Sequence, residues 1–166
     1  MHYYDLYESP HGQMLLVAEG EGLSGVYFER QKYQPQIEPE WRREPRHALL
    51  RQAKRELAEY FGGERKRFET ALAPKGTPFQ RSVWNAISTV DFGKTITYGE
   101  LASRAGCAGS ARAAGAATGR NPIGIIVPCH RIVGSNGSLT GYAGGLDRKR
   151  ALLALESGIP DLLSAA

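Results

Sequence analysis

The stretch TYGELASRAGCAGSARAAGAATG, residues 97–119, decides how the second half of this chain folds. Thr97 and Glu100 form a capping-box pattern, which predicts that a first helix begins there. A short turn containing Gly109 follows, and Ser110 is placed to cap a second helix. Two short helices joined by a glycine-containing turn indicate a helix-turn-helix.

The second of these helices, over residues 111–118, consists almost entirely of alanine and glycine, with Arg112 as its main long polar side chain. A helix that reads bases in the major groove needs Arg, Gln or Asn side chains to address the base edges. Small residues instead let the backbone approach DNA closely, which favours binding without sequence preference, as in a narrow groove. From composition alone, an alanine-rich helix packed inside a core is the alternative.

The first thirty residues predict a different kind of structure, a meander of antiparallel strands. Residues 13–18 and 23–28 are apolar runs, and glycine-containing turn signals precede each of them. Residues 46–61 then show helical spacing and end at Gly62-Gly63. The face expected to be buried carries Leu50, Ala53, Leu57 and Phe61.

A linker-like segment over residues 64–77 separates this part from a further helix, which is expected over residues 78–89. The sequence thus predicts an α/β (α+β) chain with an N-terminal sheet-and-helix domain over residues 1–76. A mostly helical domain with the helix-turn-helix follows over residues 77–166. The expected buried side of the helix after the linker is formed by Phe79, Val83, Trp84 and Ile87.

Length and composition limit the classes of function. The chain has 166 residues, a net charge of +4 and two cysteines, and no apolar run approaches the roughly 20 residues of a membrane span. Because no secretory signal is visible at the start, a cytoplasmic protein with free thiols is expected. The mild positive charge permits a polyanionic partner. No CxxC or HxxxH pair is present, so no metal site is predicted.

A reactive thiol is indicated by Pro128-Cys129-His130-Arg131, which follows an apolar run over residues 125–127 that is expected to form a buried strand. A thiol is a good nucleophile only as the thiolate, and a nearby imidazole, directly or through a water, can accept its proton. A carboxylate behind the imidazole would orient it. Glu156, near the end of a helix expected over residues 148–155, is the candidate for that role.

Residues 128–134, Pro-Cys-His-Arg-Ile-Val-Gly, closely resemble the signature of the O6-alkylguanine-DNA alkyltransferase family. Further motifs resemble that family in the right order and spacing, and the likeness runs from about Thr77 to Glu156. The length and the strand-rich start resemble the free-standing bacterial members of the family. The resemblance implies a ribonuclease H-like N-terminal domain and no cofactor. The further motifs are residues 77–80, 98–102, 111–115, 121–123 and 141–145.

The resemblance also assigns catalytic roles. Cys129 matches the acceptor whose thiolate takes the alkyl group from O6-alkylguanine, and also from O4-alkylthymine, once and irreversibly. His130 matches the group that removes the thiol proton through a water, and Glu156 matches its carboxylate partner. Tyr98 matches the tyrosine whose hydroxyl supports the departing base. Asn121 matches the hinge residue that precedes the active-site segment.

The resemblance further implies contacts with alkylated double-stranded DNA. Arg112 matches the side chain that fills the duplex where the damaged base is flipped out. The chain is expected to act as a monomer, with cooperative binding along DNA left open. The expected DNA-contacting residues are Tyr98, Ala111, Arg112, Ala113 and Ser135. The expected substrate-binding residues are Tyr142, Ala143, Ile132 and Thr118.

One position departs from the family. At Thr118 some members carry an apolar residue that packs on the flipped base, so looser base packing is expected here. Arg131 is interpreted as an ion-pair residue rather than a catalytic one, and Cys107 as incidental. Two other functions remain possible from sequence: a DNA-binding regulator or lesion-flagging protein, which typically lacks the acceptor cysteine, and a Cys-His-Glu hydrolase.

Overall fold

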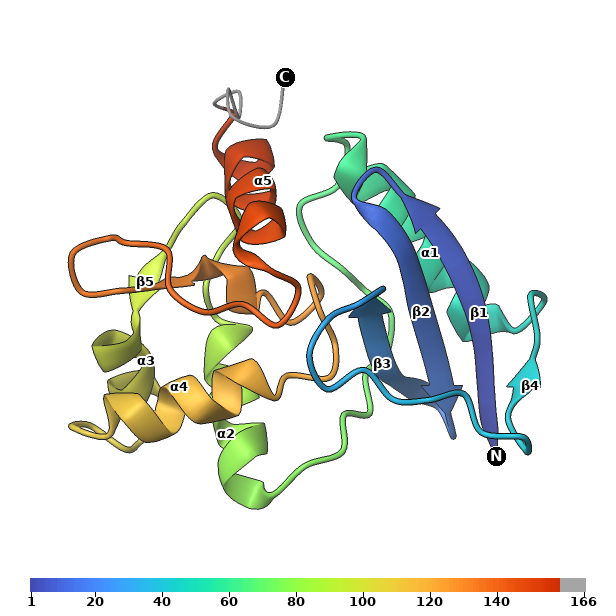
Figure 1. Ribbon diagram of the computed structural model, residues 1–166, viewed down its shortest axis with the longest axis horizontal. Helices are drawn as coiled ribbons and strands as arrows, with labels where there is room; N and C mark the ends of the chain where they lie inside the picture. The colour runs from blue at the N-terminus through green and yellow to red at the C-terminus, as the bar shows by residue number, and fades with distance from the viewer. Residues whose placement is uncertain (159–166) are drawn as a thin grey trace. The chain divides into compact units, whose positions relative to one another are not determined.

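The computed structural model describes residues 1–158, and Figure 1 shows its helices and strands. The chain forms two compact units. The first contains Met1–Lys75 together with Pro122–Gly124, and the second contains Gly76–Asn121 together with the chain from Ile125 onward. The elements in chain order are β1 (His2–Ser9), β2 (Gly12–Glu19), β3 (Gly22–Phe28), β4 (Arg42–Arg43), α1 (Ala48–Phe61), α2 (Pro78–Ile87), β5 (Ile96–Thr97), α3 (Tyr98–Arg104), α4 (Ala111–Gly119), the 3₁₀ helix η1 (Cys129–Arg131), β6 (Ile132–Val133) and α5 (Leu146–Ser157).

The sheet of the first unit has the strand order β3-β2-β1-β4. The strands β1, β2 and β3 are antiparallel neighbours, which confirms the predicted meander. Both hairpins close over two residues, since Ser9 faces Gly12 and Glu19 faces Gly22. The short β4 lies parallel to β1, and nothing in its two arginines predicted a strand.

The helix α1 packs against the sheet through β1 and β2 (Figure 1). Its buried residues include Leu50, Ala53 and Leu57, as the helical spacing predicted. The prediction of Phe61 was wrong, because Tyr60 is the fully buried aromatic residue at this end of the helix. Glu56 is also buried, so the centre of the buried stripe runs through Tyr60 and leaves Phe61 at its margin.

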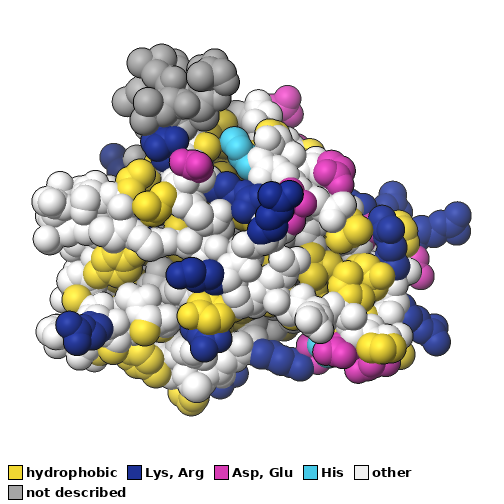
Figure 2. Space-filling model, viewed as in Figure 1, with side chains coloured by type: hydrophobic (Ala, Val, Ile, Leu, Met, Phe, Trp, Pro, Cys, Tyr) yellow, Lys and Arg dark blue, Asp and Glu magenta, His cyan; other side chains and the backbone are white. Residues whose placement is uncertain are grey.

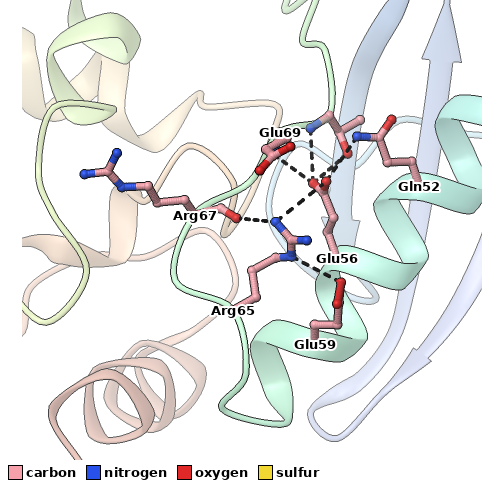
Figure 3. A network of polar contacts seen from close by, with 7 residues as sticks. Gln52, Glu56, Glu59, Arg65, Arg67 and Glu69 are labelled. Atoms are coloured by element: carbon pink, nitrogen blue, oxygen red, sulfur yellow. Dashed lines mark hydrogen bonds and ion pairs between the residues drawn. The ribbon is translucent and has the colours of Figure 1, made fainter.

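A buried carboxylate fixes the segment that the sequence suggested was a linker. Figure 3 shows Glu56 of α1 facing the chain around Glu69. One of its oxygens accepts the N–H groups of Glu69 at 3.0 Å and Thr70 at 3.1 Å, and also the Thr70 hydroxyl at 2.8 Å. The chain beyond it pairs with β3, since Leu23 donates to the Ala71 carbonyl at 2.9 Å. This part of the segment is therefore an integral part of the first unit.

The second unit is built on α2, α3 and α4, which pack against one another, as the helix-turn-helix prediction requires. Thr97 caps α3 by accepting the Glu100 N–H at 3.1 Å, but Glu100 pairs with Arg104 instead of completing a capping box. The complete capping box belongs to Thr77 and Gln80 at the start of α2. The prediction that Ser110 caps α4 was wrong, because its side chain makes no capping bond.

Two further predictions for this half of the chain were wrong. Phe79 is 40% exposed, because it lies in the first turn of α2, before the buried positions Val83 and Trp84. Residues 125–127 form turns and a bend rather than a buried strand. The strand pair of the second unit consists instead of β5 and β6, which are parallel.

Residues 122–124 pair with the sheet of the first unit. Val26 donates its N–H to the Pro122 carbonyl at 2.8 Å, and Gly124 donates to the Val26 carbonyl at 2.9 Å. Within residues 1–158, no helix has both the length and the apolar character needed to cross a membrane. No cluster of His, Cys, Asp or Glu side chains in this range is arranged to hold a metal ion.

Candidate active site

The site begins with an irregular path that leads to Cys129. Asn121 is buried, and its Nδ2 donates to the carbonyl of Val127 at 2.9 Å, which closes a loop over the intervening residues. The same carbonyl accepts the N–H of Cys129 at 2.8 Å around Pro128, whose φ of −81° and ψ of 64° are those of an inverse γ-turn. The nucleophile therefore follows a tight turn and opens the helix η1.

Ile125 within this loop has a φ of 68° and is 1% exposed. A β-branched residue in the left-handed region is strained by roughly 1–2 kcal/mol. Such strain persists only where the surroundings determine the conformation. Here the bond from Asn121 to the Val127 carbonyl closes the chain over the strained residue just before Cys129.

Cys129 is buried, with 7% of the residue exposed. Burial raises its pKa, while the Asn121 side chain and the positive charge of Lys149 act in the opposite direction without reversing the shift. A thiol with a raised pKa is mainly protonated at neutral pH, so it needs a base to become a nucleophile.

His130 is fully buried, and its Nε2 lies 2.6 Å from Oε2 of Glu156. With the proton on Nε2 shared with the carboxylate, the lone pair of Nδ1 is left as an acceptor, and Nδ1 has no hydrogen-bond partner among residues 1–158. Burial lowers the pKa of His130 despite the raising effect of Glu156. The ring is therefore neutral near pH 7 and able to take a proton.

Glu156 also binds Arg131, as the ion-pair interpretation of Arg131 predicts. The guanidinium donates from Nε to Oε1 at 2.7 Å and from Nη2 to Oε2 at 3.0 Å. Its Nη1 donates to the carbonyl of Val90 at 2.7 Å. A bidentate pair of this kind is strong and directional. It fixes the carboxylate that in turn orients His130.

Lys149 is a residue of this site that the sequence reasoning missed. Its side chain is fully buried, and its Nζ donates to the carbonyls of Ile132 at 2.6 Å, Thr140 at 2.8 Å and Gly141 at 3.3 Å. Burial lowers its pKa to about 8, which the nearby Cys129 partly counteracts. Its helical register with the buried Leu152 and Glu156 is the signal that could have revealed it.

Two tyrosines flank Cys129. The hydroxyl of Tyr98 donates to the carbonyl of Thr140 at 3.2 Å, and the pKa of Tyr98 is raised by burial. Burial, followed by the charge of Cys129, raises the pKa of Tyr142 well above its usual value. Ala143, beside Tyr142, is half-buried. The loop that the sequence assigned to the base therefore lies close to the nucleophile.

The helix α4 divides its residues between two faces. Arg112 and Ala113 are exposed and Ala111 is half-buried, whereas Thr118 is buried. The Thr118 hydroxyl donates to the Ala114 carbonyl of its own helix at 2.7 Å, so its polar atom is already occupied. Gly115 faces Tyr98, because a Cβ at this position would lie 3.6 Å from the ring.

The positive charge of the chain belongs to this half. Residues 1–75 carry twelve Lys and Arg and twelve Asp and Glu, so the net charge of +4 lies in residues 76–166. In the view of Figure 2, the surface over α2, α3 and α4 at the lower left shows Lys and Arg side chains among apolar and uncharged ones. Ser135, expected to contact DNA, is exposed in the loop after β6.

The structure thus gathers Cys129, His130, Glu156 and Tyr98 with Lys149 around one small site, and keeps Arg112 and Ser135 on the surface. Ile132 is buried, and it meets the site through its carbonyl, which accepts from Lys149.

Two family models match the chain. One, "6-O-methylguanine DNA methyltransferase, DNA binding domain", matches residues 78–158. The other, "6-O-methylguanine DNA methyltransferase, ribonuclease-like domain", matches residues 2–74. The methylated-DNA–protein-cysteine methyltransferase of Methanosarcina acetivorans is 49% identical over 154 residues, which cover 93% of this chain and 97% of that protein. The protein of the same name from Haemophilus influenzae is 42% identical, covering 93% of this chain and 86% of its own length.

Solved structures are similar over almost the whole chain. The OGT of Mycobacterium tuberculosis, crystallised in complex with DNA, matches with a TM-score of 0.89 and 42% identity over 98% of both chains. The O6-methylguanine-DNA methyltransferase of Pyrococcus kodakaraensis shares the fold, with a TM-score of 0.53 and 23% identity over 94% of this chain and 99% of that one. The similarity therefore covers both units.

Proposed function

The chain belongs to the 6-O-methylguanine DNA methyltransferase family, and from this premise we propose that it repairs alkylated DNA by moving the alkyl group of O6-alkylguanine onto Sγ of Cys129. O4-alkylthymine is the second proposed substrate. The product is a thioether, and no step of the reaction returns the thiol. Each molecule therefore acts once.

The arrangement of Cys129, His130 and Glu156 supports the activation step. The thiol proton passes through a bridging water to Nδ1 of His130, an atom without a hydrogen-bond partner in the described part of the chain. The imidazolium that forms is stabilised by Glu156, 2.6 Å from Nε2. Lys149 stabilises the thiolate at the same time, because its charge lowers the pKa of Cys129.

The transfer step is an in-line displacement at the alkyl carbon. Sγ of Cys129 forms the new carbon–sulfur bond as the bond to O6 breaks, and the electron pair stays on the guanine. The departing purine anion is stabilised by a hydrogen bond from the hydroxyl of Tyr98. Asn121 contributes by fixing the Val127 carbonyl that closes the turn before Cys129.

Access to the target requires that the damaged base leave the duplex, because the alkyl group is unreachable within the base stack. The exposed, nearly featureless face of α4 suits approach to DNA of any sequence, with Ala111 and Ala113 against the backbone and Arg112 in the space left by the flipped base. Ser135 would meet a phosphate, and the flipped base would lie among Tyr142, Ala143, Ile132 and Thr118.

In this proposal, residues 1–76 form the supporting domain and residues 77–166 the DNA-binding and acceptor domain. The protein acts as a monomer in the cytoplasm. Both of its cysteines are free, which suits a reducing compartment.

The test is the stoichiometry of transfer from a duplex with one O6-methylguanine. We expect one methyl group per protein molecule, found on Cys129 by mass spectrometry, and then no further activity. Cys129→Ser should abolish transfer and keep duplex binding, while Cys107→Ser, the matched control at the other free cysteine, should leave transfer unchanged. Continued turnover would contradict the single-use mechanism. Methyl transfer to the Cys129→Ser variant would contradict the assignment of Cys129 as the acceptor.

The role of Arg112 predicts a difference between substrates. Arg112→Ala should slow transfer from the duplex by about tenfold or more, because a vacated stack costs a few kcal/mol. Transfer from a free O6-alkylguanine base should change little. Equal losses on both substrates would remove Arg112 from base flipping.

A further inference from the structure

The carbonyl of Thr140 accepts two hydrogen bonds from side chains of different helices. Lys149 on α5 donates from Nζ at 2.8 Å, and Tyr98 on α3 donates from its hydroxyl at 3.2 Å. The two donors are also near each other, since Nζ lies 6.0 Å from the centre of the Tyr98 ring. One loop carbonyl therefore joins the residue expected to support the departing base to a buried lysine.

All three N–H donors of the Lys149 ammonium have carbonyl acceptors in this region. The ammonium has three N–H groups, and three carbonyls lie within hydrogen-bond distance, from Ile132 on β6 and from Thr140 and Gly141 of the loop. The side chain is fully buried. Lys149 thus fastens the loop that leads to Tyr142 onto β6.

Tyr98, in contrast, has a single proton to donate, and it is bound to Thr140 in the structure. To support the base, the hydroxyl must leave that carbonyl and turn to an acceptor on the purine. Thr140 is an exposed residue, so its carbonyl is not stranded when the hydroxyl leaves. Lys149 stays bonded to the same carbonyl and keeps it in place.

We propose that Lys149 is a positioning residue for Tyr98: it fastens residues 140–141 and so holds the Thr140 carbonyl that places the Tyr98 hydroxyl before this hydroxyl moves to the departing base. This inference rests on the proposed function, since it gives Tyr98 its part in that reaction. Lys149 itself does not touch the base and acts through Tyr98.

The experiment is a double-mutant cycle with Lys149→Met and Tyr98→Phe in a Cys107→Ser background. The readout is the single-turnover rate constant for transfer from the methylated duplex. Because the charge of Lys149 also acts on Cys129, each rate is divided by the rate at which iodoacetamide alkylates Cys129 in the same variant. Lys94→Met is the matched control, since Lys94 is an exposed lysine of the same unit.

We expect Tyr98→Phe to lower the corrected rate by about tenfold or more, as loss of a donor to a departing anion does. Lys149→Met should lower it by a similar factor, and the double variant should be no slower than Tyr98→Phe alone. Lys94→Met should match the parent. Losses that multiply in the double variant would overturn the inference, because Lys149 would then act independently of Tyr98.

Two further measurements keep the test decisive. Lys149→Gln retains N–H donors without the charge, so it should recover part of the corrected rate that Lys149→Met loses. This variant keeps the test open if the methionine variant folds poorly. A Lys149→Gln variant whose corrected rate is as low as that of Lys149→Met would contradict the hydrogen-bonding role. If the parent itself transfers no methyl group, the proposed function fails, and this outcome is distinct from multiplying losses in an active parent.

Discussion

Each of the two units buries one glutamate, and the surroundings of the two carboxylates differ. Glu56 of the first unit accepts hydrogen bonds from Gln52, from the Thr70 hydroxyl and from backbone N–H groups, and Arg65 lies 3.9 Å from its Oε2 (Figure 3). Glu156 of the second unit accepts from His130 and Arg131, a titratable ring and a permanent cation. Both side chains are 1% exposed.

The difference shows that burial of a carboxylate does not by itself indicate function. The amide, hydroxyl and backbone donors, with Arg65 nearby, hold Glu56 in place, so it stabilises the chain at Thr70. A neighbour that gains and loses a proton can use the charge of Glu156 during a reaction. The kind of donor, rather than the depth of burial, separates the structural glutamate from the one proposed to be catalytic.

The largest effect is expected at Glu156. Glu156→Gln should lower the single-turnover rate of methyl transfer by about 100-fold or more, because His130 loses the charge that stabilises its protonated form. Glu56→Gln is the matched control, and its folded form should transfer at the parent rate. Equal losses in the two variants would erase the distinction between the two sites.

The next effect is on stability, and it is expected at Glu56. Glu56→Gln should lower the free energy of unfolding by about 1–3 kcal/mol, because a glutamine that turns its amide oxygen to the N–H groups of Glu69 and Thr70 turns its N–H₂ to the Nε2 donor of Gln52. Urea unfolding of the variant and the parent measures this loss. An unchanged midpoint would mean that the carboxylate does not fix the segment.

The free energy of unfolding of the parent and that of Glu56→Gln should depend differently on pH. Burial raises the pKa of Glu56, but hydrogen bonds from Gln52, Thr70 and the backbone outweigh it and leave the pKa below 4.5. The unfolded chain therefore binds this proton first as the pH falls, so the stabilisation by Glu56 is complete above about pH 4.5 and shrinks below it. The difference in unfolding free energy between the parent and Glu56→Gln should be constant from about pH 6 to 8 and narrow at lower pH. A difference that widens in acid would contradict the lowered pKa.

The smallest effect is expected at the cation beside Glu56. Arg65 lies 3.9 Å from Oε2 of Glu56 and is partly exposed, so Arg65→Met should change the free energy of unfolding by about 1 kcal/mol or less. Arg131→Met, which breaks a bidentate buried pair with Glu156, should cost about 3–5 kcal/mol. Thermal unfolding of the two variants compares them, and similar losses would show that charge matters equally at both sites.

Much of the fold could be predicted because its signals are local. The hairpins of the first thirty residues, the cap at Thr97 and the spacing of Leu50, Ala53 and Leu57 each depend on residues a few positions apart. Helix ends were less predictable: Phe61 and Phe79 both lie in terminal turns, where the buried stripe of a helix is no longer defined by both neighbouring turns.

The segments that failed prediction depend on distant partners. The strands β4, β5 and β6 have two residues each, too few for a periodic pattern, and they exist because β1 or one another lies alongside. Residues 125–127 are apolar enough for a strand, but the bond from Asn121 to Val127 bends them into a loop. Nothing in the sequence indicated that residues 122–124 pair with β3.

The sequence by itself determined the chemistry this chain carries. Adjacent residues provide the thiol and the imidazole, and the run of small residues on α4 provides the surface that we propose for DNA, because both are properties of neighbouring positions. The tertiary structure decided how the chemistry is controlled. It brings Glu156 to His130, turns the Thr118 hydroxyl onto its own helix, and buries Lys149 beneath the loop at Thr140. A lysine in a helix is ordinarily expected at the surface, and only the three carbonyls that surround Nζ make it part of the site.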